Sequence, residues 1–212
     1  CLVASAVLFR FDGFSGEMFP QFKLRFENQP PLRQVVSDQQ STDVDAQSPA
    51  PPWTAEQDSV GFLGSNRTAV ISPRRFAVPE EASQIKTLWN QGIGEGWSSF
   101  AVSGDRAVTL EQRDDEECVT CYRLRDGQLL WLVKHRSRHE NTLGGVGPRS
   151  TPTIVGDRVY AQGATGHVWC IELSSGSVQW KVDLLERAGW DQVESEEAIT
   201  WGRAASPLLV DG

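Results

Sequence analysis

The stretch Val119-Thr-Cys-Tyr-Arg-Leu-Arg-Asp-Gly-Gln-Leu-Leu-Trp131 recurs 49 residues later as Val168-Trp-Cys-Ile-Glu-Leu-Ser-Ser-Gly-Ser-Val-Gln-Trp180. Both copies place a Cys, a Leu, a Gly and a Trp at the same positions. Residues 99–108 likewise match residues 151–160 at an offset of 52, and a third copy begins within residues 205–212. Self-similarity at a period of about 50 residues indicates a repeat architecture.

Each copy of the repeat predicts four short strands. Residues 152–155 and 158–162 flank a Gly-Asp turn and are expected to form a hairpin. Residues 167–173 and 178–182 supply two more strands, joined by a turn in which Gly176 tolerates a positive φ. A four-stranded sheet with two apolar faces buries them by stacking against further copies. The sequence therefore predicts an all-β fold, a β-propeller of four-stranded blades. A β-sandwich would not repeat the same text.

The composition is typical of short strands joined by turns. The 212 residues include 19 Gly, 11 Pro and eight Trp, and 39% are hydrophobic, which is enough for a core. A formal net charge of -8 argues against a nucleic-acid partner, because a phosphate backbone selects clustered Lys and Arg. The four cysteines are too few and too scattered to form a disulfide scaffold.

The N-terminal part of the chain differs in composition from the repeats. Leu2–Phe9 is an uninterrupted run of apolar and small residues, shorter than the about 20 needed to span a bilayer. We interpret residues 1–26 as a truncated membrane anchor with its juxtamembrane segment. The tail of a signal sequence, a lipidated Cys1 and a buried strand are the alternatives. The polar, Pro-containing residues 27–58 predict a flexible linker, and residues 59–212 the start of the propeller.

The repeats resemble a known family. Quinoprotein dehydrogenases carry a tryptophan-docking repeat, Ala-x-Asp-x-x-Thr-Gly-Lys-x-x-Trp. Its Gly and Trp occur in Cys170–Trp180 and, less closely, in Cys121–Trp131, whereas its Ala, Asp, Thr and Lys are replaced. Four further segments resemble membrane-anchored PQQ-like propeller proteins of planctomycete-type bacteria: residues 12–16, 147–152, 163–166 and 201–207. The resemblance implies eight blades when complete. This chain would be an open arc of two to three, built from residues 99–131, 151–180 and 205–212 onward.

The resemblance covers enzymes and non-enzymes, so an activity has to be sought in the residues. For the enzymes it implies PQQ and a calcium ion on the axis, a vicinal Cys-Cys disulfide and an Asp base. None of these can be matched in this sequence, and we predict no catalytic residue, no metal site and no cofactor. We expect a non-catalytic, membrane-tethered platform on the periplasmic side, binding a protein partner or small ligand on a propeller face. The alternative is a PQQ-dependent alcohol or sugar dehydrogenase.

One local pattern approaches the spacing of a two-Cys two-His zinc finger. It comprises Cys118, Cys121, His135 and His139. Strand residues three apart point to opposite faces of a sheet, so the two sulfurs are not expected to converge. We therefore predict buried thiols and loop histidines.

Three other segments have simpler interpretations. The acidic run Asp114–Glu117 predicts a solvated hairpin turn, and the Gly-rich segment Gly92–Trp97 a turn between blades. Glu186–Glu197 is acidic and is expected to form a long loop between two blades. Propellers place binding surfaces on such loops, so this segment is the predicted interaction site.

Overall fold

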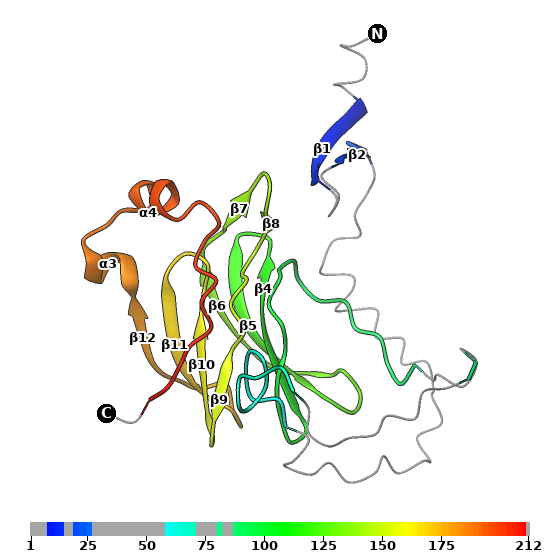
Figure 1. The fold of residues 1–212 in the computed structure, drawn as a ribbon, viewed down its shortest axis with the longest axis vertical. Coiled ribbons are helices and arrows are strands. Elements are labelled where there is room, and N and C mark those ends of the chain that lie inside the picture. The colour runs from blue at the N-terminus through cyan, green and yellow to red at the C-terminus, as the bar shows by residue number, and fades with distance from the viewer. Residues whose placement is uncertain (1–7, 15–18, 27–57, 71–79, 82–86, 211–212) are drawn as a thin grey trace.

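Two four-stranded antiparallel sheets form the body of the molecule (Figure 1). The computed structural model describes residues 8–14, 19–26, 58–70, 80–81 and 87–210. Blade 1 consists of β3 (Ala101–Ser103), β4 (Arg106–Arg113), β5 (Glu116–Arg123) and β6 (Leu129–Arg136). Blade 2 consists of β9 (Thr153–Val155), β10 (Arg158–Gln162), β11 (His167–Glu172) and β12 (Val178–Asp183). In both blades the strands are paired in sequence order, and the blade 2 strands begin and end within one residue of their predicted limits.

Short elements connect or follow the blades. The hairpin of β7 (Glu140–Asn141) and β8 (Gly145–Val146) joins them, and α3 (Leu184–Ala188) and α4 (Gln192–Ala198) follow β12. The prediction of a loop over Glu186–Glu197 is therefore wrong. The Asp183 side chain caps α3, and Asp191 forms a capping box with Glu194 at the start of α4, so the segment folds as two short helices.

The N-terminal region contains a β-hairpin within the predicted juxtamembrane segment. Its strands, β1 (Phe9–Phe14) and β2 (Pro20–Leu24), pair with a bulge between Phe11 and Gly13. Residues 1–7, which carry most of the apolar run, and linker residues 27–57 lie outside the described residues. In the part of the chain that the structure describes, every helix is too short or too polar to cross a membrane.

The blades pack face to face around one hydrophobic core. In blade 1, cross-strand pairs align Ala101, Val108, Cys121 and Trp131 in a single row over all four strands. The core cluster joins this row to side chains of blade 2: Ile154, Val159, Ala161, Trp169, Ile171 and Leu173. Burial of apolar area contributes roughly 25 cal/mol per Å². This interface is therefore the main source of stability, and it confirms the predicted stacking of neighbouring repeats.

Trp131 joins β6, the outermost strand of blade 1, to blade 2. Its indole is 8% exposed, and its Nε1 donates a hydrogen bond of 2.9 Å to the carbonyl oxygen of Leu173. The ring lies directly on Gly176, where an added Cβ would come within 2.7 Å of it. Gly176 also has a φ of 77°. Glycine is required there both for the turn and for the close approach of the ring.

The same contact occurs once more on the other side of blade 1. Trp89 Nε1 donates to the carbonyl oxygen of Leu124 at 2.8 Å, and its ring lies on Gly127, which has a φ of 71°. Leu124 and Gly127 are the repeat counterparts of Leu173 and Gly176. The repeat pattern does not reveal Trp89, because this residue precedes Trp131 by 42 residues, a different interval from the 49 that separate Trp131 and Trp180.

Trp180 occupies the equivalent position on β12, as predicted. Trp131 pairs with Cys121 and Trp180 with Cys170, and each Cys is followed by an irregularity in the strand pairing. Trp180 is nevertheless 45% exposed, and no glycine that the structure describes lies against its ring. On the exposed face of blade 2, Trp180 therefore has no glycine turn against its ring among the described residues, unlike Trp89 and Trp131.

The third repeat begins beside blade 2. The Ser99 amide donates to the Thr151 hydroxyl at 3.4 Å, and the Thr151 amide donates to the Ser206 hydroxyl at 2.9 Å, so equivalent residues of successive repeats are linked. Thr153 Oγ1 also donates to the Pro207 carbonyl at 2.6 Å. The predicted strand does not form within residues 203–210. These contacts run through side-chain hydroxyls and do not build a backbone ladder.

We expect Gly176→Ala to destabilise the protein more than Gly156→Ala. Both glycines have positive φ, so each substitution costs about 1 kcal/mol of backbone strain. Only at Gly176 would the new Cβ also overlap the Trp131 ring, whereas at Gly156 nothing lies within 4 Å. The difference in unfolding free energy, measured by urea denaturation, should be about 1–3 kcal/mol. Equal losses in the two variants would show that the ring contact does not hold the blades together.

Candidate functional site

Several loops meet at one end of the two blades, shown at the top of Figure 1. This loop end comprises the β7–β8 hairpin, residues 163–166, helices α3 and α4, and residues 199–203. Hydrogen bonds join its parts: Asn141 Nδ2 to the Thr200 carbonyl at 3.0 Å, the Leu184 amide to the Gly166 carbonyl at 3.0 Å, and the Arg203 amide to the Ala164 carbonyl at 3.0 Å. Loops held on a rigid scaffold are where propellers place function.

Glu117 is the buried acid of the loop end. It is 1% exposed, and its carboxylate accepts hydrogen bonds from the Ala164 amide at 2.7 Å and from Thr165 Oγ1 at 3.5 Å. Gly163 lies so close that a Cβ there would overlap the carboxylate. Glu117 therefore belongs to blade 1 but holds a loop of blade 2.

This position corrects the interpretation of Asp114–Glu117 as a solvated turn. Asp114 and Asp115 are exposed at the tip of the β4–β5 hairpin, and Glu116 forms an ion pair with Lys134 at 2.9 Å. Glu117 follows Glu116 in a strand, and successive strand residues face opposite sides of a sheet. It therefore points into the blade interface, and the prediction is wrong for this residue.

Burial raises the pKa of Glu117 to about 7, although the hydrogen bonds from Ala164 and Thr165 partly offset this by favouring the charged form. Its cross-strand partners are Gln112 on β4 and His135 on β6. At neutral pH this buried acid is therefore partly protonated.

Titratable side chains from both blades meet beside the core. The rings of His135 on β6 and His167 on β11 have centroids 3.9 Å apart. Lys181 Nζ lies 3.0 Å from His135 Nδ1, and His167 Nε2 lies 3.4 Å from an Asp183 oxygen. Burial, followed by the nearby His135 and Lys181, lowers the pKa of His167 to about 4. His167 is therefore neutral at pH 7, and the cluster is a polar contact between the blades.

The two cysteines of the zinc-finger-like pattern do not converge. Cys118 pairs with Glu111 and Cys121 with Val108, so strand alternation places the two thiols on opposite faces of blade 1. Burial raises the pKa of each thiol to about 12, which keeps both protonated and unreactive at neutral pH. His139 is buried against Gly202, away from that sheet. Among the residues that the structure describes, no three His, Cys, Asp or Glu side chains form a group that could hold a metal ion.

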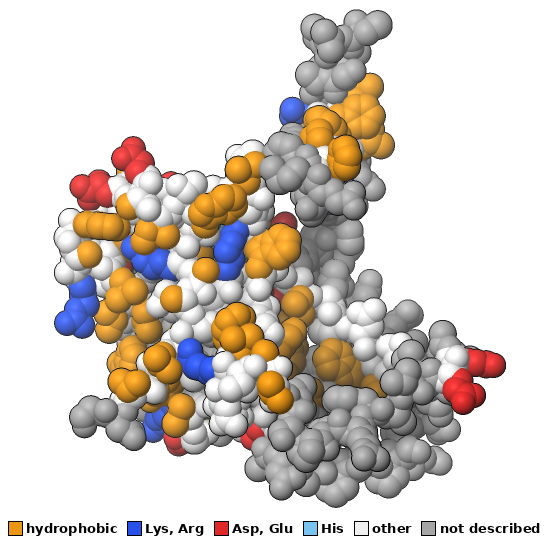
Figure 2. All heavy atoms as spheres, in the orientation of Figure 1, with side chains coloured by type: hydrophobic (Ala, Val, Ile, Leu, Met, Phe, Trp, Pro, Cys, Tyr) orange, Lys and Arg blue, Asp and Glu red, His pale blue; other side chains and the backbone are white. Residues whose placement is uncertain are grey.

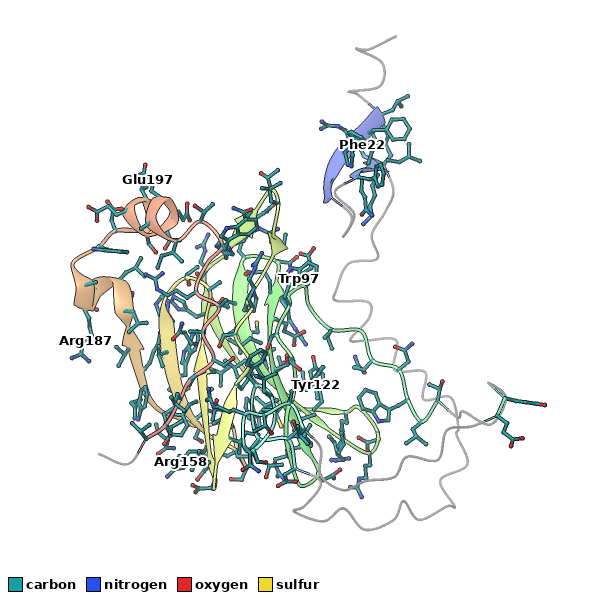
Figure 3. All side chains as sticks on the ribbon, in the orientation of Figure 1. Phe22, Trp97, Tyr122, Arg158, Arg187 and Glu197 are labelled. Atoms are coloured by element: carbon teal, nitrogen blue, oxygen red, sulfur yellow. The ribbon has the colours of Figure 1, made fainter. Side chains whose placement is uncertain are left out.

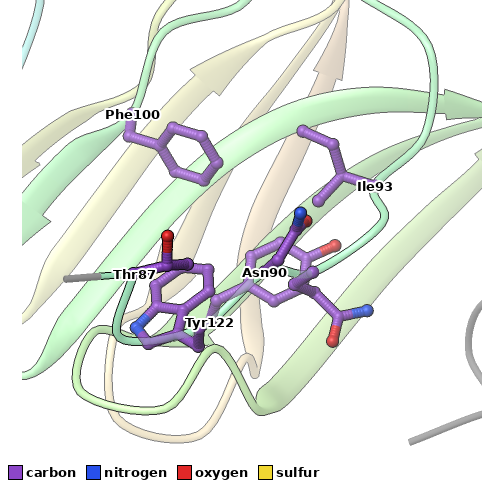
Figure 4. Close-up of a pocket in the computed structure, with 7 residues that line it drawn as sticks. Thr87, Asn90, Ile93, Phe100 and Tyr122 are labelled. Atoms are coloured by element: carbon purple, nitrogen blue, oxygen red, sulfur yellow. The ribbon is translucent and has the colours of Figure 1, made fainter. Parts of the chain in front are cut away.

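A pocket of about 260 Å³ lies against the other face of blade 1 (Figure 4). The Gly-rich segment predicted to form a turn between blades borders it and pairs with β4 through Glu95 and Gln112. At the pocket floor the Tyr122 hydroxyl donates to Glu111 and accepts from Arg113, both at 2.8 Å. All lining residues are uncharged: Thr87, Trp89, Asn90, Gln91, Ile93, Phe100 and Tyr122. The pocket therefore offers aromatic rings and amides, without a free acid or base.

Repeated four-stranded blades joined by docked tryptophans define a PQQ-like repeat β-propeller, present as a partial arc. A sequence profile of this class, described as outer membrane protein assembly factor BamB, matches residues 42–207. The chain belongs to this PQQ-like propeller family. No curated protein matches the chain.

Solved structures of related fold include a BamB and two quinoprotein enzymes. BamB from Moraxella catarrhalis shares 18% identity at a TM-score of 0.34, with 46% of this chain and 28% of that chain covered. A europium-containing methanol dehydrogenase shares 16% identity at 0.31, covering 40% and 14%. The quinohemoprotein alcohol dehydrogenase ADHIIG from Pseudomonas putida HK5 shares 17% at 0.30, covering 43% and 13%. The chain thus spans less than a third of the length of these structures.

We expect Glu117→Gln to alter how stability depends on pH. Because the folded-state pKa of about 7 exceeds the ordinary 4.5, the folded protein holds an extra proton between these values. The resulting stabilisation is complete below pH 4.5 and is lost as the pH rises through 7. The lowered pKa of His167 acts oppositely, so stability from that residue increases between pH 4 and 6.5.

Wild-type protein should therefore lose stability between pH 4.5 and 8, and the variant should not. The unfolding free energy of the variant minus that of wild type should rise by about 2–3 kcal/mol over this range. Denaturant unfolding across this range measures the difference. Glu116→Gln, on the opposite face of the same strand, is the matched control. A difference that does not vary with pH would mean that Glu117 does not titrate in the folded protein.

Proposed function

We propose that this chain is a non-catalytic binding platform, tethered to a membrane and facing outside the cytoplasm, on which a protein partner docks. The observation that carries the proposal is that both buried carboxylates, those of Glu111 and Glu117, are already hydrogen-bonded within the fold. Glu111 accepts hydrogen bonds from Tyr122 and Arg113, and Glu117 accepts them from the 163–166 loop. A general acid or base must reach the proton that it transfers, whereas these two acids are engaged inside the fold.

The family profile supports a binding role. It is described as an outer membrane protein assembly factor, and assembly of other proteins requires contact with them. Partner binding would fall to the loop end, because its loops are fixed by hydrogen bonds and its surface includes the charged helix α4. The proposed platform therefore uses the same end of the blades as the predicted interaction segment Glu186–Glu197.

The alternative, a PQQ-dependent alcohol or sugar dehydrogenase, would require PQQ and calcium. The described residues do not fit that site, since Glu117 lies between the blades, Glu111 lies on the other face of blade 1, and both carboxylates already have partners. We expect the full-length protein, supplied with PQQ and calcium, to show no dye-linked oxidation of alcohols or sugars above background. A known quinoprotein dehydrogenase under the same conditions is the positive control. Sustained turnover would establish the dehydrogenase and refute the platform.

Membrane tethering and a periplasmic location rest on the apolar run Leu2–Phe9 and the polar segment 27–58. A flexible chain of that length would hold the propeller about 30 Å from the bilayer, and an acidic domain would be repelled by anionic lipid. We expect the protein of cells expressing the full-length gene to fractionate with membranes. Protease added to spheroplasts should cleave within residues 27–58. Recovery in the cytoplasmic fraction, protected from protease, would contradict this location.

A further inference from the structure

We propose that Trp97, Trp201 and Leu143 form a docking surface for a partner-protein segment that carries aromatic or aliphatic side chains next to Lys or Arg. The inference rests on the proposed function, because it names the surface and the partner chemistry of that platform. We call the three side chains the loop-end patch. Two of them come from segments that precede and follow the β7–β8 hairpin, and the third lies in its turn.

The turn of the hairpin contacts both indoles. The ring of Trp201 lies against Gly144, where an added Cβ would be 2.9 Å from Cε3, and that of Trp97 lies against Gly145, where a Cβ would be 3.4 Å from Nε1. Leu143 precedes these two glycines. Figure 2 shows hydrophobic side chains gathered around this hairpin, and Figure 3 labels Trp97 near the ends of β4 and β8. Trp97, 48 positions before Gly145, and Trp201, 57 positions after Gly144, therefore both pack against this turn.

The members of the patch are unusually exposed for their size. Trp97 is 68% exposed, Trp201 51% and Leu143 53%, whereas the docking residue Trp131 is 8% exposed. These three side chains are not part of the hydrophobic core between the blades. Folding therefore does not account for large apolar side chains at this place, and exposed clusters of this kind mark binding sites. Tryptophan is also the residue that most often dominates binding energy at protein interfaces.

The backbone under the patch is fixed. The Trp97 amide donates to the Pro148 carbonyl at 2.8 Å, and Asn141 links the hairpin to Thr200, next to Trp201. Arg149 donates to the carbonyl oxygens of Gly144 and Gly147, which pins the turn from below. A surface that is already ordered loses little conformational entropy when a partner binds.

Charge selects the chemistry of the partner. Three arginines at or beside the loop end have internal partners, since Arg149 donates to carbonyl groups, Arg138 pairs with Glu140, and Arg203 donates to Ser195, whereas Arg187 on α3 is exposed. Acidic side chains outnumber these arginines in the segments of the loop end: Glu140, Glu186, Asp191, Glu194, Glu196 and Glu197. This excess of negative charge attracts Lys and Arg and repels an anionic lipid surface. A basic segment with apolar anchors therefore fits better than a membrane or an acidic peptide.

The test uses fluorescence anisotropy with the full chain and three labelled 12-residue peptides. One alternates Trp or Leu with Lys or Arg, the second replaces the basic residues with Glu, and the third replaces the apolar residues with Ser. We expect the first peptide to bind at least tenfold more tightly than the other two. The double variant Trp97→Ala/Trp201→Ala should weaken this binding tenfold or more with an unchanged melting temperature. Trp180→Ala, which removes an exposed indole elsewhere, should leave it unchanged.

A second set of variants separates charge from apolar contact. Replacing Glu194, Glu196 and Glu197 by Gln should reduce both the affinity for the basic peptide and its dependence on salt. Equal binding of the acidic peptide, or unchanged binding by the double Trp variant, would overturn the inference. Binding abolished by Trp180→Ala instead would move the docking surface to the open face of blade 2 and leave the platform in place. Turnover with PQQ and calcium would refute the platform itself, so the two failures are distinguishable.

Discussion

The contact on which this structure depends is an indole ring packed on a glycine turn, with its N–H donating to a carbonyl oxygen of that turn. The ring of Trp131 fills the space that any side chain at Gly176 would occupy, and its hydrogen bond to Leu173 satisfies the one polar atom of the buried indole. The contact fixes the distance and the register between neighbouring blades. The same geometry at Trp89 and Gly127 shows that it is a property of the repeat.

At one end of the interface between the blades, the buried side chains are polar. We call this row the polar seam. The core row of blade 1 is followed by a row of Leu110, Val119 and Val133, and then by a row of Gln112, Glu117 and His135. A buried carboxylate is costly unless it is bonded or neutralised. Glu117 does both, since it accepts two hydrogen bonds and its pKa rises to about 7. The seam thereby ties the 163–166 loop, and through it the rest of the loop end, to blade 1.

The proposed binding role depends on the rigidity of the loop end. Its hairpin, helices and residues 199–203 are joined by hydrogen bonds from the backbone and from Asn141, so their side chains are presented in fixed positions. The buried acids serve packing, and the apolar side chains that packing does not use are exposed at this end. These rigid, exposed aromatic residues are the basis of the proposed recognition of a partner protein.

The sequence by itself determined the repeat and therefore the blades. The Gly-Asp turn before Arg158, the turn at Gly176 and the recurring Trp131 and Trp180 are local signals, and the strands of blade 2 lie within one residue of the limits they predict. The capping signal of Asp191 and Glu194 is also present in the sequence, although it did not prevent the segment from being interpreted as a loop. Tertiary structure alone decided the rest. The inward direction of Glu117, the docking of Trp89 and the packing of Trp97 and Trp201 on one turn depend on how distant segments pack, which the spacing of side chains along the chain does not reveal.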